Sequence, residues 1–151
     1  MAKYLALDWD QREARFVVAR PKGDSIVVDQ AVAVPIELGA QQGNHDNLAE
    51  QLQQALLRAS LPKCQALVAV GRSLIELDRL QLPPAPEEEL PEMVRFQAMR
   101  DFASLQENSP LDFVPLGDAG NEPGEIIAAA IPKDLSEEVT SALSAQGQEP
   151  H

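Results

Sequence analysis

Short apolar runs separated by polar turns dominate the first part of the chain. The run at 4–7 is continuously apolar, as expected of a strand that is buried on both faces, and it ends in a polar turn at 8–12. A second apolar run lies at 16–19, and a third, rich in β-branched residues, follows the turn at 21–24 and covers 26–34. Three strands joined by short turns predict a β-meander.

A helix and another buried strand follow the meander. Apolar residues recur at helical spacing from Leu48 to Ala59, and Asn44 or Asp46 is the expected N-cap. The apolar run at 66–70 then predicts a short strand that is buried on both faces. Because a strand reached through a helix normally lies parallel to its neighbour, the pattern predicts a mixed sheet.

From residue 74 onward the apolar pattern predicts a second, smaller subdomain. Its first strand changes phase near Asp78 and Arg79, which predicts a bend, a bulge or a passage from one sheet to another, and a proline-rich run at 83–86 ends it. Pro115 places a later strand at a sheet edge, because proline has no N–H to donate. The remaining runs predict an amphipathic helix, two strands and a last helix, at 90–105, 111–116, 126–131 and 135–143.

The predicted fold class is therefore α/β, in two parts. Residues 1–73 form a mixed-sheet region, and residues 74–151 form a strand-helix-strand-strand-helix subdomain. The last helix opens at a capping box of Asp134 and Glu137, and Gly147 ends it. Since another strand is expected after this helix, we expect the natural chain to continue further.

Negative charge is concentrated in the second half of the chain. The formal net charge is -12; residues 1–75 hold eight acids and eight bases, whereas residues 76–151 hold sixteen acids and four bases. A field of this sign repels phosphate backbones, so it argues against nucleic acid and favours a basic peptide or protein as the partner. The alternative is that the acidity only keeps a small subdomain soluble.

Cysteine usage and hydropathy indicate the compartment. Cys64 is the single cysteine, so no internal disulfide can form, which fits a reducing environment. The N-terminus has no basic-then-apolar signal segment, and no apolar run approaches the roughly 20 residues that a membrane span needs. We expect a cytoplasmic protein without direct membrane insertion.

The candidate catalytic chemistry is sparse. Asp8 and Asp10 are the type of residue that binds Mg²⁺ in ribonuclease-H-like nucleases, but they also suit a solvated hairpin turn, and no further acids obviously converge on them. The sequence contains no Walker loop, nucleophile elbow or dinucleotide fingerprint. These observations favour a binding protein over an enzyme and predict no metal site.

Three arginines stand out against the acidic second half. Arg79, Arg95 and Arg100 are three of its four bases. They suit either pairing with carboxylates of the same subdomain, which we favour, or a role in binding a partner.

Four segments of the chain together carry a family resemblance. They are 72–84, which ends in Pro83-Pro84; 88–98, which opens with glutamates and a proline; 110–113; and 128–133. These segments resemble the type IV pilus assembly protein family PilM. The resemblance covers essentially the whole chain, as the N-terminal portion of that family, and it is most specific in the middle.

The resemblance implies an actin-like, ribonuclease-H-related fold that is also seen in the cell-division protein FtsA. Residues 1–73 would be the first part of the large actin-like subdomain, and residues 74–151 the small inserted one. It also implies a cytoplasmic scaffold, peripheral to the inner membrane, that grips the N-terminal tail of a membrane-anchored PilN-like partner between these subdomains. The resemblance is also compatible with a role in a related secretion system and with self-association into a homo-oligomer.

PilM-like proteins are also described as nucleotide binders, and here the sequence departs from the pattern. Actin-like proteins hold phosphate with a turn of the form Asp-x-Gly followed by Ser or Thr, in which glycine lets backbone N–H groups approach the anion. The matching residues are Asp8, Asp10 and Gln11, with no glycine and with a carboxylate at the second position. We therefore expect no cofactor here, with ATP and Mg²⁺ as the family alternative.

Overall fold

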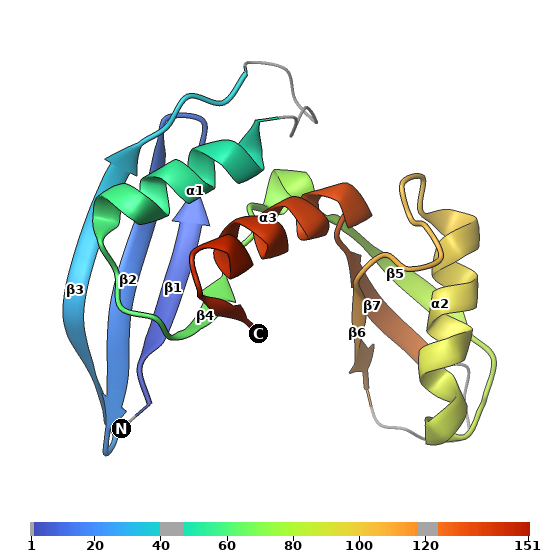
Figure 1. Ribbon diagram of the computed structural model, residues 1–151. Helices are drawn as coiled ribbons and strands as arrows, with labels where there is room; N and C mark the ends of the chain where they lie inside the picture. Colours follow the sequence, from blue (N-terminus) through green and yellow to red (C-terminus); the bar gives the residue numbers. More distant parts are fainter. Residues whose placement is uncertain (1, 40–46, 118–123) are drawn as a thin grey trace. The chain divides into compact units, whose positions relative to one another are not determined.

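The computed structural model describes residues 2–39, 47–117 and 124–151 (Figure 1). The chain forms two compact units. The first contains the chain up to Gly71 together with Glu137–His151, and the second is Arg72–Ser136. Asn44 and Asp46, the expected caps of the first helix, lie outside the described residues.

A five-stranded mixed sheet forms the first unit, with the strand order β3-β2-β1-β4-β8. The pairs β1–β2 and β2–β3 are antiparallel, whereas β4 lies parallel to both β1 and β8. The predicted meander and the predicted parallel strand are both confirmed. The elements of this unit are β1 (Tyr4–Trp9), β2 (Glu13–Lys22), β3 (Ser25–Pro35), α1 (Leu48–Ala59), β4 (Gln65–Val68), most of α3 (Lys133–Ala145) and β8 (Glu149–Pro150).

Within the described parts of the chain, only one face of this sheet is buried. Leu5 and Leu7 of β1 are at most 2% exposed, whereas Ala6 between them is exposed. In β4, Ala66 is buried and Leu67 is 48% exposed. Successive side chains of a strand point to opposite faces, and the described helices α1 and α3 lie on one side of the sheet (Figure 1). The expectation that β1 and β4 are buried on both faces is therefore wrong for this chain.

The C-terminal residues return to the first unit, which changes the predicted division at residue 73. Strand β8 pairs with β4, and the Gln148 side chain, 4% exposed, accepts a hydrogen bond from Cys64 N and donates one to Pro62 O. Glu138 of α3 accepts a hydrogen bond from Ala49 N in the first turn of α1 at 2.9 Å. A carboxylate is favourable at this helix end because the N–H groups there have no intrahelical partner. The predicted last helix thus exists, but most of it belongs to the first unit.

The second unit is a three-stranded antiparallel sheet with one helix against it. The strand order is β5-β7-β6, so β6 lies at an edge, as Pro115 predicts. Val94 and Ala98 of the helix are fully buried against apolar residues of the sheet. The elements are β5 (Glu76–Leu82), α2 (Leu90–Asp101), β6 (Leu111–Leu116) and β7 (Gly124–Ala130).

Strand β5 has no bend at the predicted position. It pairs with β7 in unbroken register, from Glu76 opposite Ala130 to Leu82 opposite Gly124. Leu80 and Leu82 face the core, whereas Leu77 lies on the other face and is 42% exposed. The apparent phase change therefore reflects an exposed leucine, Leu77, that does not belong to the buried face.

Candidate functional site

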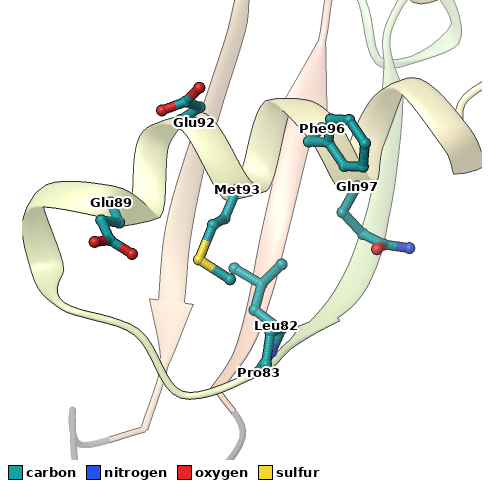
Figure 2. A pocket seen from close by; sticks show the side chains of 7 residues that line it. All are labelled: Leu82, Pro83, Glu89, Glu92, Met93, Phe96 and Gln97. Atoms are coloured by element: carbon teal, nitrogen blue, oxygen red, sulfur yellow. The ribbon is translucent and has the colours of Figure 1, made fainter.

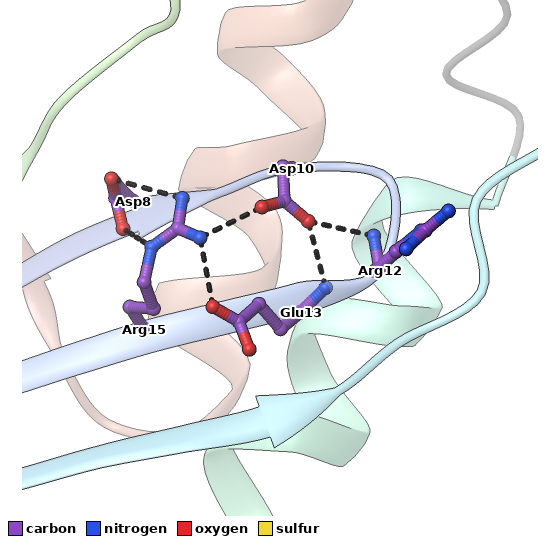
Figure 3. A network of polar contacts seen from close by, with 5 residues as sticks. All are labelled: Asp8, Asp10, Arg12, Glu13 and Arg15. Carbon is purple, nitrogen blue, oxygen red and sulfur yellow. Dashed lines mark hydrogen bonds and ion pairs between the residues drawn. The ribbon is translucent and has the colours of Figure 1, made fainter.

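The end of β1 and the turn that leads into β2 contain Asp8, Asp10 and Gln11, which match the phosphate turn of the family, and hydrogen bonds to the Asp10 side chain hold this turn in place. Asp10 N donates to Glu13 O at 3.0 Å. Asp10 Oδ1 accepts hydrogen bonds from Arg12 N at 2.7 Å and from Glu13 N at 3.0 Å (Figure 3). Two backbone N–H groups that an anion would need are therefore already occupied by a carboxylate.

The segment after β3 donates backbone hydrogen bonds to carbonyl groups of the same turn. Ile36 N donates to Arg12 O at 2.8 Å, and Leu38 N donates to Gln11 O at 3.4 Å. The Gln11 residue is exposed at the tip. Several donors and acceptors of this turn are thus paired within the protein, which favours one fixed backbone conformation. They are the N–H groups of Asp10, Arg12 and Glu13 and the carbonyl oxygens of Gln11, Arg12 and Glu13.

Arg15 joins the predicted carboxylates into one network. It lies opposite Asp8 in the β1–β2 register and binds that carboxylate with two nitrogens, Nε to Oδ1 at 2.6 Å and Nη2 to Oδ2 at 3.1 Å. Its Nη1 also donates to Asp10 Oδ2 at 2.7 Å and to Glu13 Oε1 at 3.0 Å (Figure 3). Such charge-assisted, bidentate geometry is specific in orientation.

The network shifts two protonation equilibria. The hydrogen bond from Arg15, followed by those from the backbone N–H groups of Arg12 and Glu13, lowers the pKa of Asp10 to about 2. Hydrogen bonds to Asp8, Asp10 and Glu13, in that order, raise the pKa of Arg15 above its ordinary value. Asp10 is therefore ionised at neutral pH, where it competes with any incoming anion.

This arrangement does not fit a triphosphate. Three carboxylates surround one guanidinium, so negative charge exceeds positive charge at the place where phosphates would lie. A phosphate would also have to displace Asp10 from Arg12 N and Glu13 N. As for a metal, the described residues contain no group of three His, Cys, Asp or Glu side chains that is placed to hold an ion.

Asp10→Asn is expected to remove part of the acid sensitivity of the first unit. The folded-state pKa lies below the ordinary value of 3.8, so the ionised carboxylate stabilises the fold above about pH 4 and this contribution is lost as the pH falls toward 2. At pH 7 the variant should melt at a lower temperature than the parent, and the difference should shrink toward pH 2. Asp24→Asn, in the turn between β2 and β3, is the control. An unchanged difference at both pH values would contradict this role.

The three arginines considered for pairing within the subdomain or for partner binding have different surroundings. Arg79 on β5 is exposed and lies 3.7 Å from Glu125 of β7. Arg100, near the end of α2, is exposed. Arg95 donates to the carbonyl oxygens of Ser109, at 3.1 Å from two nitrogens, and of Glu107, at 3.0 Å. Arg95 thus fastens the loop between α2 and β6 to the helix.

Arg95→Ala is expected to destabilise the second unit by about 1–3 kcal/mol, because carbonyl groups lose charge-assisted partners and one of them belongs to the buried Ser109. Arg100→Ala, five positions along the same helix, should change stability by less than about 0.5 kcal/mol. Chemical denaturation of both variants checks the comparison. Equal losses would contradict the fastening role.

Sequence reasoning missed an apolar groove on the outer side of α2. Met93, Phe96, Leu82 and Pro83 line it together with Glu89, Glu92 and Gln97, and its volume is about 430 Å³ (Figure 2). The signal was a row of large apolar residues at three-residue spacing beside the core stripe of the same helix.

The two units define a mixed-sheet α/β protein in which a three-stranded, helix-backed unit is inserted before the last strand of the first sheet. Among the described residues, no helix is both long and apolar enough to cross a membrane. No protein-family model matches the sequence, and no curated protein matches it.

Several solved structures share this fold, among them the following two. The first is a chain of the PilM–PilN type IV pilus biogenesis complex, with a TM-score of 0.73 and 23% sequence identity over 99% of this chain. The second is the cytoplasmic domain of EpsL, an inner membrane component of the type II secretion system of Vibrio cholerae, with a TM-score of 0.57 and 14% identity over 99% of this chain. The present chain spans 45% and 56% of those chains, respectively. The expected PilM-like fold is confirmed.

Proposed function

We propose that this chain is a cytoplasmic assembly protein of a type IV pilus or a related secretion system, held at the inner membrane by a partner. In this role it binds the N-terminal tail of a membrane-anchored, PilN-like protein and catalyses no reaction. The fold similarity to a chain of the PilM–PilN complex, over 99% of the present chain, is the observation that carries the proposal. The similarity to cytoplasmic EpsL, from another secretion machinery, supports the broader class.

The closed β1–β2 turn supports binding of a polypeptide over binding of a nucleotide. A glycine-containing phosphate turn keeps its N–H groups available for the anion. Here the Asp10 carboxylate accepts two of these N–H groups and is itself bound to Arg15. We infer that this turn is a structural hairpin and does not depend on ATP or Mg²⁺.

Calorimetry with a synthetic tail peptide tests the proposal. The peptide is the cytoplasmic N-terminal segment of the PilN-like protein of the same organism, and the control is the same composition in scrambled order. We expect saturable binding of the native tail, unchanged by Mg-ATP, and none of the scrambled tail. Absence of heat at high micromolar concentrations of the native tail would contradict the proposal.

A further inference from the structure

Helix α2 has two apolar faces, although only one of them is needed for its own core. Val94 and Ala98 are fully buried against the second sheet. On the outer side, Met93, Phe96 and Met99 follow one another at three-residue spacing, with Phe96 70% and Met99 44% exposed. Residues three apart lie next to each other on a helix surface, so these three side chains form a continuous stripe. Exposed methionine and phenylalanine in one row are typical of the centre of a protein interface.

The end of β5 turns this stripe into a groove. Leu82 and Pro83 lie beside Met93, whose side chain points toward Leu82, and the groove is about 430 Å³ in volume (Figure 2). A groove in which Phe96 keeps most of its surface exposed does not enclose a small molecule, since small-molecule pockets bury most of their ligand. It suits the apolar side of a helix or peptide laid along α2.

The charge around the groove selects the partner. Glu89 and Glu92 are the charged residues that line it, and no base does. Glu87 and Glu88 precede them in the short helical turn before α2, so four carboxylates lie at this end.

The nearby bases do not balance these carboxylates. Arg95 is bound to the carbonyl groups of Ser109 and Glu107 on the α2–β6 loop. The base that follows the stripe is Arg100, in the last turn of α2. A partner segment that is complementary to this groove is therefore apolar, with lysine or arginine at the end that contacts the first turn of α2.

We propose that the outer face of α2 is a docking site for an amphipathic, basic segment of a partner protein. Apolar side chains of that segment pack on Phe96 and Met93, and its cationic end lies against Glu89 and Glu92. The inference concerns the second unit alone and goes beyond binding of the membrane partner's tail. It holds whichever machinery the chain serves.

The test uses the complete chain and a designed helical peptide of about four turns, with leucines on one face and lysines at one end. Fluorescence anisotropy measures the affinity, and the control peptide carries glutamate in place of each lysine. Phe96→Ala is expected to weaken binding at least tenfold, because truncated aromatic anchors dominate interface energies. Glu89→Lys with Glu92→Lys should weaken it about tenfold at low salt and less at high salt, as rim charges are screened.

Two controls isolate the groove from general effects. Val114→Ala removes an apolar side chain that is 63% exposed on β6, and it should leave the affinity within twofold. Glu37→Lys with Glu50→Lys changes the net charge by the same amount in the first unit and should also have little effect. Circular dichroism of the Phe96→Ala variant should match that of the parent, because this side chain lies outside the core.

Three results would overturn the inference. The first is equal affinity for the lysine and glutamate peptides, and the second is a Phe96→Ala variant that binds as the parent does. The third is a dimer in sedimentation experiments that Phe96→Ala dissociates, because the groove would then be occupied by a second copy. The tail titration is independent: a chain that binds the designed peptide but not the tail would retain this docking site and lose the proposed function.

Discussion

Phe102→Ala is expected to lower the free energy of unfolding of the second unit by about 3–5 kcal/mol. The Phe102 side chain is 6% exposed and belongs to the cluster that joins α2 to β5 and β7. Its backbone N–H also donates to Ala98 O at the end of the helix. Removal of the ring leaves a cavity among residues held by a regular sheet, which has limited freedom to collapse.

Hydrogen exchange of the amides of β5 and β7 measures this loss, because a two-unit chain need not unfold in one transition. Phe96→Ala is the matched control: it is the same substitution six residues earlier, on α2, at a side chain that is 70% exposed, and it should cost less than about 0.5 kcal/mol. Similar losses for the two variants would show that the core of this unit is placed incorrectly.

Leu143→Ala is expected to destabilise the first unit by about 2–5 kcal/mol. Leu143 lies near the end of α3 and is 0% exposed. Its carbonyl oxygen accepts hydrogen bonds from Gln146 N and Gln148 N, which turn the chain toward β8. The substitution should therefore accelerate amide exchange in β1 and β4, strands that lie more than 70 residues earlier in the sequence.

Leu57→Ala is the control for this comparison. Leu57 lies on α1, where it is 62% exposed, so its removal creates no internal cavity. The cost should remain within about 0.5 kcal/mol. If Leu143→Ala destabilised only the second unit, the assignment of α3 to the first unit would be contradicted.

The helices and strands could be predicted because their signals are local. Alternation and helical spacing identified the α-helices and the strands up to β7 in the described part of the chain, and Pro115 placed β6 at an edge. Gly147, with φ at +73°, ends α3 as its position in the sequence predicted. Such signals depend on residues a few positions apart, so a single sequence contains them completely.

The long-range packing could not be predicted from the same signals. The capping residues Asp134 and Glu137 indicate that a helix begins there, but they do not indicate which sheet it packs against. That depends on pairs such as Gln148 with Cys64, which are 84 residues apart. Likewise, the apolar run 4–7 predicts a strand but cannot reveal whether one face or both faces are covered. For this reason, the prediction wrongly placed Glu137–His151 in the second subdomain, although these residues belong to the first unit.

The β1–β2 turn shows the same limit at the level of a site. The sequence identified Asp10 as unfavourable for phosphate from its charge and from the missing glycine. It did not identify Arg15, whose role follows from the hairpin register that places it opposite Asp8. Because of that register, Arg15 donates hydrogen bonds to the carboxylates of Asp8, Asp10 and Glu13. The missing glycine alone does not indicate these contacts.

The direct test of the account is a comparison of two ligands on one chain. Thermal unfolding is recorded with Mg-ATP and, separately, with the PilN-like tail peptide. A ligand at about 100 times its dissociation constant adds about 2.7 kcal/mol of stability. We expect a higher melting temperature with the tail and an unchanged one with Mg-ATP. A rise with Mg-ATP and none with the tail would contradict it.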